Sequence, residues 1–370
     1  MQTIKPRTVA RRVPGAGSGI ARPGRRDRVA RAVAATSALA LLGSAGALGG
    51  EMTEANAQSL YSITLAEQPF NGLAATQLGQ DKGIFAHYGL KVTLKPVSTV
   101  AIITAEVQSG QAQIGYGVLA ITDNAIEKGV GVKCVAPVET VAHPIKGYPQ
   151  GAFMVAKGSN ITSPKQLEGK TVGLPALQGP DYLEAKEAVT NAGGDWTKVK
   201  TAQVGFADMN AALKSGEIQA ANEVSPFIEQ GLSTGETKII TNFDTYLAGL
   251  TGQCYMASDS FLSKNKGLVD RFVMAQDQAI LFAQAHPTEA NAEIAKVSGL
   301  PAAAVKGSLP PKIFYSDDLK PQTMVKYEQW QKKWGGLAGP IIPASKLAYV
   351  APGTPMHKLL FNADGKYIGG

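Results

Sequence analysis

The sequence predicts an α/β protein whose two halves resemble each other. Stretches typical of strands alternate with stretches typical of helices, and this order implies parallel sheets covered by helices on both faces. Residues 104–116 and 210–222 also read alike at an offset of 106 residues. Each segment closes a helix with Ser-Gly, where glycine suits a left-handed turn, and then enters a short apolar strand. The echo indicates two similar α/β lobes or one long sheet.

The elements follow in the same order in both halves. In the first half we expect strands at 62–66, 90–96 and 113–117, and helices at 72–86, 101–109 and 119–128. In the second half we expect strands at 171–174, 199–204 and 219–222, and helices at 180–192 and 209–215. Further helices are expected at 266–285, 287–297 and 321–334, before a Gly- and Pro-rich loop region that wraps the first half from Gly335 onward.

Two segments have the character of crossings between the halves. Residues 147–154 leave the first half through closely spaced glycine and proline. Residues 245–256 return from the second half and lead into an apolar strand at 253–257. Hydrophobic residues make up 44% of the chain and charged residues 18%, a balance that lets a soluble globular protein bury a core.

The basic excess of the chain lies at its N-terminus. The formal net charge is +7, but residues 1–57 carry nine basic and three acidic side chains. The rest of the chain therefore holds 27 basic and 26 acidic residues, a net charge of +1. Because nucleic-acid binding depends on neutralising phosphates with Lys and Arg, we expect no nucleic-acid partner.

Residues 1–57 also have the anatomy of a signal peptide. An Arg-rich stretch ends at Arg31, an uncharged Ala- and Leu-rich run follows at 32–50, and residues 55–57 read Ala-Asn-Ala. This small-x-small pattern predicts cleavage after Ala57 and export to the periplasm, with no cysteine nearby to make a lipoprotein. The pair Arg25-Arg26 leaves both the general secretory and the twin-arginine routes open. The alternative is a disordered basic tail.

Only two cysteines occur, Cys134 and Cys254. An oxidising compartment permits a disulfide between them, and two buried free thiols are the alternative. Neither cysteine has metal-ligand spacing, so we expect no metal site and no cofactor.

Four stretches carry a resemblance to a known family: 80–92 (QDKGIFAHYGLKV), 167–173 (LEGKTVG), 208–216 (DMNAALKSG) and 257–262 (ASDSFL). They resemble the periplasmic solute-binding proteins of the family that contains the sulfonate, taurine and nitrate receptors and the THI5/NMT1-like thiamine-precursor proteins. The resemblance covers roughly residues 60 to 335, and its ordered series of stretches is more specific than any single one.

The resemblance implies a type II periplasmic-binding-protein fold, in which two α/β lobes joined by two crossover segments close on one ligand. Lobe I would comprise residues 58–150 and 250–370, and lobe II residues 151–249. It also implies partners, namely a small organic ligand and the permease and ATPase subunits of an ABC importer. We expect the binding protein itself to be a monomer and not an enzyme.

The candidate ligand-binding residues follow from one rule: in open α/β sheets, ligands bind outside the carboxyl ends of the strands. Helix N-termini at that edge also offer unpaired N–H groups. The residues at these positions are Glu67, Gln68, Phe70, Asn71, Ser98, Thr99, Gly117 and Val118 in the first half, and Leu177, Gln178, Gly179, Asp181, Tyr182, Asn222 and Glu223 in the second.

Several of these residues, and their neighbours, have structural interpretations as well. Ser98 and Thr99 are suited to cap a helix, and Asp208 has the position of an N-cap. Phe70 fits either a core or a planar ligand. Glu67 and Glu223 end their strands at the proposed mouth, where a carboxylate favours a ligand with an amino group or ring N–H donors. The ligand classes left open are sulfonates such as taurine, thiamine-related pyrimidines and aromatic acids.

Two other functions remain open at this point. Relatives on the same fold make a thiamine pyrimidine precursor, and the resemblance implies that such an enzyme uses a histidine and iron-binding cysteines. The four histidines here are widely spread, with His87 expected at the surface and His143 in a turn, and no cysteine cluster exists. No nucleophile elbow or phosphate-binding loop occurs either. The second alternative is a ligand-sensing surface protein.

Overall fold

Ten strands in the described residues, 60–68, 71–138, 151–305 and 319–369 of the computed structural model, form two five-stranded sheets. The first sheet has the order β2-β1-β3-β10-β4, with β1 Tyr61–Glu67, β2 Leu90–Pro96, β3 Ile114–Val118, β10 Gln253–Ser258 and β4 Val132–Pro137. The second has the order β7-β6-β8-β5-β9, with β7 Lys200–Gln203, β6 Thr171–Leu174, β8 Ala220–Val224, β5 Gly151–Ala156 and β9 Thr237–Asn242. The two orders correspond strand by strand, which confirms an internal repeat.

One strand in each sheet runs against its neighbours, so the expectation of purely parallel sheets is wrong. β10 pairs antiparallel with β3 and β4, and β5 pairs antiparallel with β8 and β9. Gln253 pairs with Val118 and Gly151 with Val224, so both reversed strands begin beside the carboxyl end of a neighbour. A segment that enters a sheet from that edge must run opposite to the strands that end there. The strands β4, β5 and β9 were not predicted, and the start of β5 lies in the predicted crossing at 147–154.

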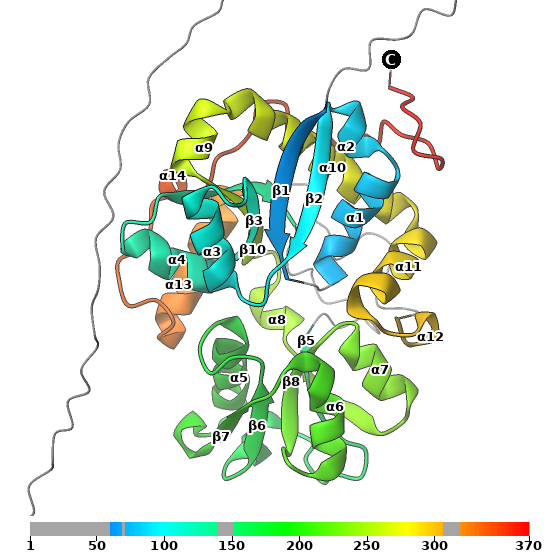
Figure 1. Ribbon diagram of the computed structural model, residues 1–370. Coiled ribbons are helices and arrows are strands. Elements are labelled where there is room, and N and C mark those ends of the chain that lie inside the picture. Colours follow the sequence, from blue (N-terminus) through cyan, green and yellow to red (C-terminus); the bar gives the residue numbers. More distant parts are fainter. Residues whose placement is uncertain (1–59, 69–70, 139–150, 306–318, 370) are drawn as a thin grey trace, which may run out of the picture. The chain divides into compact units, whose positions relative to one another are not determined.

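Helices cover both faces of the second sheet (Figure 1). Its helices are η2 Pro164–Leu167, α5 Pro180–Asn191, η3 Trp196–Lys198, α6 Phe206–Ser215, α7 Phe227–Ser233 and α8 Asp244–Leu247. Ala185 and Val189 of α5 pack with Val172 of β6 in one buried cluster. Met209 of α6 and Ile228 of α7 lie in a second cluster on the other face. The N-cap of α6 is Gly205, and Asp208 lies in the first turn, so the N-cap interpretation of Asp208 is wrong.

The predicted helix at 72–86 is three shorter pieces. These are η1 Asn71–Leu73, α1 Ala74–Asp81 and α2 Ile84–His87. Gly83 has φ +72°, a left-handed conformation that interrupts the helical hydrogen bonds and that glycine adopts without a steric penalty. The other helices of the first half are α3 Val100–Ser109 and α4 Leu119–Glu127, each within one residue of its predicted range.

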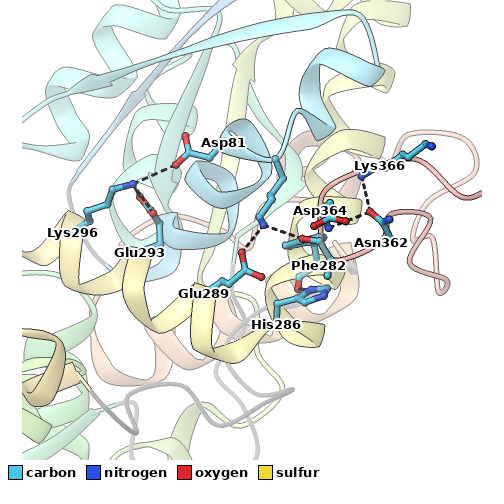
Figure 2. Close-up of polar contacts among 11 residues, drawn as sticks. Asp81, Phe282, His286, Glu289, Glu293, Lys296, Asn362, Asp364 and Lys366 are labelled. Atoms are coloured by element: carbon cyan, nitrogen blue, oxygen red, sulfur yellow. Dashed lines mark hydrogen bonds and ion pairs between the residues drawn. The ribbon is translucent and has the colours of Figure 1, made fainter.

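The C-terminal third returns to the first sheet. Its helices are α9 Asp259–Lys264, α10 Lys266–Ala285, α11 Pro287–Ser298, α12 Ala302–Val305, α13 Pro321–Trp334 and α14 Ala344–Leu347. Figure 2 shows the ion pair between Lys296 of α11 and Asp81 of α1, and Lys296 also contacts Glu293 within α11. The segment after Gly335 packs along β4 and α10, where Tyr349 N donates to Cys134 O and Leu360 N donates to Gln278 Oε1. This confirms the predicted wrapping of the first half.

Cys134 and Cys254 are joined in a disulfide that links β4 to β10. Both cysteines are buried, with exposed fractions of 1% and 0%. The bond closes a loop of 120 residues that contains the whole second sheet. Within the described residues, none of the helices is long and apolar enough to span a membrane.

The echo in the sequence is a repeated hydrogen-bonding unit. Gln113 N donates to Thr64 O, and Gln113 Oε1 accepts from Thr64 N at 2.9 Å. In the second sheet Gln219 N donates to Thr171 O, and Gln219 Oε1 accepts from Thr171 N at 3.0 Å. Each glutamine amide also donates to the glycine carbonyl that closes the preceding helix. A glutamine after the helix therefore ties the helix end to the neighbouring strand in both halves.

We expect Gln113→Leu and Gln219→Leu each to lower the free energy of unfolding by about 1–2 kcal/mol, because each leaves a strand N–H without its acceptor. Urea denaturation of the two variants measures the loss. Gln111→Leu is the matched control, because Gln111 is exposed. Equal stability of all three variants would contradict this role of the two glutamines.

Candidate ligand site

The predicted residues of the first sheet lie at the carboxyl ends of β1, β2 and β3. Gln68 Nε2 donates to Ser98 O at 2.9 Å and so ties the loop after β1 to the loop after β2. Thr99 is the N-cap of α3, where its hydroxyl accepts from Ile102 N at 3.3 Å. Asn71 begins η1, and Phe70 lies outside the described residues. The capping interpretation is therefore confirmed for Thr99.

Glu67 is the most unusual of these residues. It is the last residue of β1 and only 6% exposed. Its Oε2 atom has no hydrogen-bond partner among the residues that the structure describes. Burial raises the pKa of its carboxyl from 4.5 to about 8, because the charged form loses its hydration. A buried polar group without a hydrogen-bond partner lowers the stability of the fold unless a further donor or acceptor pairs with it.

Gly117 and Val118 end β3 beside the start of β10. A Cβ atom added at Gly117 would lie 3.2 Å from Met256 Sδ and from Thr122 Oγ1, so a side chain here would require these neighbours to shift by a few tenths of an ångström. Val118 is buried and precedes α4, whose first N–H, that of Leu119, donates to Gly252 O at 2.8 Å. Gly117 and Val118 therefore contribute backbone and buried packing at the end of β3.

In the second sheet the loop after β6 leads directly into α5. Leu177 and Gln178 are exposed. Gly179 has φ +113° and occupies the N-cap of α5, a conformation that favours glycine. Pro180 follows at the first helical position, where its missing N–H costs nothing. Since no side chain caps α5, its first turn presents backbone N–H groups at this edge.

Asp181, Asn222 and Glu223 gather around the first turn of α5. Asn222 Nδ2 donates to the Asp181 backbone carbonyl at 2.8 Å and to Glu184 Oε2 at 3.3 Å. Asn222 and Glu223 are both fully buried. Asn222 Oδ1 and Glu223 Oε2 have no hydrogen-bond partner in the described part of the chain. The three predicted residues thus form one group of acceptors.

Burial also dominates the electrostatics of this group. It raises the pKa of Glu223 well above 4.5, a hydrogen bond from Val224 N opposes this, and the charges of Asp181 and Glu229 raise the pKa further. Burial likewise raises the pKa of Asp181 from 3.8 to about 6. Among the described residues, neither Asp181 nor Glu223 forms an ion pair with a lysine, arginine or histidine. The group can therefore bind protons or accept hydrogen bonds from N–H donors.

Tyr182 lies apart from this group. Its hydroxyl accepts a hydrogen bond from Trp196 Nε1 at 3.0 Å, and the two rings meet edge to face. Tyr182 and Trp196 line an open groove of about 620 Å³, together with Lys186, Asp195 and Thr197. No other predicted ligand residue lines this groove, so Tyr182 is positioned by packing against Trp196 instead of by the strand end.

Helix α13 contributes contacts that the sequence did not predict. Trp330 Nε1 donates to Glu187 Oε2 of α5 at 2.5 Å, and Lys186 Nζ donates to the carbonyl of Trp334 at 2.9 Å. Burial raises the pKa of Tyr327, and the charges of Glu184 and Asp181 raise it further. Tyr327 therefore lies near the N-terminal part of α5. The aromatic residues of α13 were visible in the sequence, but no local pattern indicates their partner.

No group of three or more His, Cys, Asp or Glu side chains in the described residues has the arrangement of a metal site. His87 is exposed and stacks on Tyr367 at 4.1 Å, as a surface residue would. His143 lies outside the described residues, as do residues 1–57, where the sequence predicts a signal peptide.

The chain matches the family described as NMT1/THI5 like over residues 73–290. A curated relative, 4-amino-5-hydroxymethyl-2-methylpyrimidine phosphate synthase of Aspergillus parasiticus, is 24% identical over 259 residues, covering 67% of this chain and 74% of the relative. The alkanesulfonate-binding protein SsuA from Xanthomonas axonopodis pv. citri, bound to MOPS, superposes with a TM-score of 0.64 at 16% identity, covering 78% of this chain and 98% of that one.

The periplasmic aliphatic sulphonate binding protein SsuA from Escherichia coli also has a TM-score of 0.64, at 17% identity, covering 82% of this chain and 96% of that one. These similarities confirm the type II periplasmic-binding-protein fold.

We expect Glu67→Gln to stabilise the protein in a pH-dependent way. The folded-state pKa is about 8 and the ordinary pKa of a glutamate is 4.5, so the native carboxyl binds a proton that the unfolded one releases between these pH values. Relative to the variant, wild type should lose stability as pH rises from about 4.5 to about 8, by up to roughly 5 kcal/mol. Urea denaturation at pH 5 to 8 measures the difference in the free energy of unfolding between wild type and variant. Glu217→Gln, at an exposed position, is the control. A pH-independent difference would contradict the assignment.

We expect Trp330→Phe to lower the free energy of unfolding by about 1–3 kcal/mol, because it removes a donor from the buried Glu187 carboxylate. Trp334→Phe is the matched control, since Trp334 Nε1 has no partner among the described residues. Guanidinium denaturation of both variants separates the hydrogen bond from the loss of ring area. Equal effects would show that the hydrogen bond contributes nothing.

Proposed function

Because the chain belongs to the NMT1/THI5-like family, we propose that it is the substrate-binding component of an ABC importer. It captures one small organic solute between lobe I, residues 58–150 and 250–370, and lobe II, residues 151–249. The leader directs the chain to the periplasm and is cleaved near Ala57. The mature monomer then delivers its solute to a permease driven by an ATPase.

The observation that carries this proposal is a pair of buried acceptor groups at strand carboxyl ends, one in each sheet. Glu67 ends β1, and Asn222 with Glu223 lies in β8. Each group keeps an oxygen atom without a partner among the described residues. Open α/β sheets bind ligands at this edge, and a solute held there by both sheets would favour the closed arrangement of the lobes.

The solute classes under consideration are sulfonates such as taurine, pyrimidines and aromatic acids. The superposed SsuA proteins are sulfonate-binding by their names, and the curated relative is a pyrimidine phosphate synthase. Micromolar binding requires about 8 kcal/mol. A helix N-terminus contributes about 0.3–1 kcal/mol to an anion, so hydrogen bonds and apolar burial would supply most of the affinity.

The curated relative supports one alternative, an enzyme that makes a thiamine pyrimidine precursor on the same fold. Such an enzyme is expected to use iron-binding cysteines. The disulfide weighs against this alternative, because Cys134 and Cys254 are bonded to each other and buried in the first sheet. A sensory protein on this fold would bind the solute equally well. It would differ only in its partner.

Thermal unfolding of the full chain with a panel of sulfonates, pyrimidines and aromatic acids tests the proposal. A ligand at 100 times its Kd should stabilise the protein by about 2.7 kcal/mol. Titration calorimetry should then give one site per chain, and mass spectrometry should recover the ligand unchanged. Stabilisation by a sugar or a metal ion alone would overturn the proposal, and a chemically altered ligand would favour the enzyme.

A further inference from the structure

We propose that the solute is an organic amine or amino-substituted heterocycle, whose N–H groups donate to Asn222, Glu223 and Glu67. The inference rests on the proposed function and specifies the chemical class of its substrate. It separates this chain from a receptor for sulfonate or nitrate, for which the site would have to supply hydrogen-bond donors.

Asn222 gives the clearest indication of what the site lacks. Its Nδ2 group points at two acceptors, the Asp181 carbonyl and Glu184 Oε2. These two contacts fix the orientation of the amide, because the reversed amide would set oxygen against oxygen. The remaining atom, Oδ1, is therefore an acceptor, and it has no partner in the described residues although Asn222 is fully buried. Only a donor can satisfy it.

Glu223 repeats the pattern on the next residue of β8. Its Oε1 accepts from Val224 N at 3.1 Å, while Oε2 has no partner among the described residues. The Asp181 and Glu229 carboxylates lie close enough to disfavour its charge. A ligand cation would reverse this balance, because it attracts the carboxylates that now repel one another.

Glu67 supplies the same chemistry from the first sheet. It is 6% exposed, and its Oε2 is likewise without a partner in the part of the chain described. The acceptors thus come from both sheets, as a solute held between two lobes requires.

The first turn of α5 would by itself favour an anion, because its backbone N–H groups are not capped by a side chain. However, Asp181 lies in that turn and the carboxyl of Glu223 is beside it. A sulfonate, which stays ionised at neutral pH, would share this space with these carboxyl groups and with no paired lysine or arginine of the described chain. The carboxyl of Asp181 therefore makes the first turn of α5 better suited to a ligand with hydrogen-bond donors than to an anion.

The raised pKa values of Glu67 and Glu223 add a second expectation. Burial disfavours the charged form of both carboxyls in the free protein. A bound cation stabilises the carboxylate form, so binding of an amine should release protons. Binding of a neutral or anionic compound should not.

Titration calorimetry of the full chain with matched probes tests the inference: 4-aminopyrimidine against pyrimidine, benzylamine against benzyl alcohol, and benzenesulfonate. We expect at least one amino compound to bind ten times or more tightly than its partner without the amino group. Equal or tighter binding of the partner or of benzenesulfonate would overturn the ligand class and leave solute binding intact. Binding of none of the five would also overturn the ligand class, and the wider panel would then decide the proposed function.

A variant pair shows whether the named carboxyl is responsible. Glu223→Gln keeps the size of the side chain but removes its ability to carry a charge. We expect this variant to bind the best amino compound at least ten times more weakly than wild type does. The free variant should unfold at the same or a higher temperature than wild type, because a buried carboxyl is removed. Exposed Glu217→Gln is the control. If Glu223→Gln lowers stability and leaves the preference for the amino compound unchanged, the role of Glu223 is structural and the inference fails.

Discussion

The cost of burying a carboxyl group without a cation governs the candidate site. A buried acid must either take up a proton or find a donor, and Glu67 and Glu223 have raised pKa values for this reason. Their unpartnered oxygens belong to residues at the ends of strands. The protein therefore tolerates unfavourable groups at one edge of each sheet, where their cost is offset by the stability of the surrounding fold.

The reversed strands β5 and β10 begin at the same edges of the sheets as these groups. Each begins beside the carboxyl end of a parallel neighbour, with Gly151 opposite Val224 and Gln253 opposite Val118. The chain thus enters both sheets at the edges that carry the acceptors. The starts of β5 and β10 and the two candidate groups therefore share these edges.

The sequence predicted the repeated elements well because local signals mark them. The bounds 90–96, 171–174, 266–285 and 321–334 agree with β2, β6, α10 and α13, whose ends are set by nearby proline, glycine or a change of periodicity. β9 reads Thr-Lys-Ile-Ile-Thr-Asn and lacks a clear alternation, and β4 pairs with β10 from far along the chain. Their strand character depends on tertiary pairing, which no local pattern encodes.

The positions of the candidate site residues follow from the same local signals. Strand ends are readable, so the sequence placed Glu67, Asn222 and Glu223 at strand ends, and the structure brings the last two together with Asp181. The link between α5 and α13 was not readable, since Trp330 and Glu187 are 143 residues apart in sequence.

That missed link has a mechanical consequence. One face of α5 bonds to α13 through Lys186 and Glu187, while its first turn carries Asp181 at the candidate site. Asp181 and Glu187 are six residues apart on one helix, about 9 Å by the helical rise. A helix this short does not bend appreciably, so the contact with α13 helps to set the position of Asp181. The geometry of the candidate site therefore depends in part on a helix outside the sheet that supplies most of its acceptors.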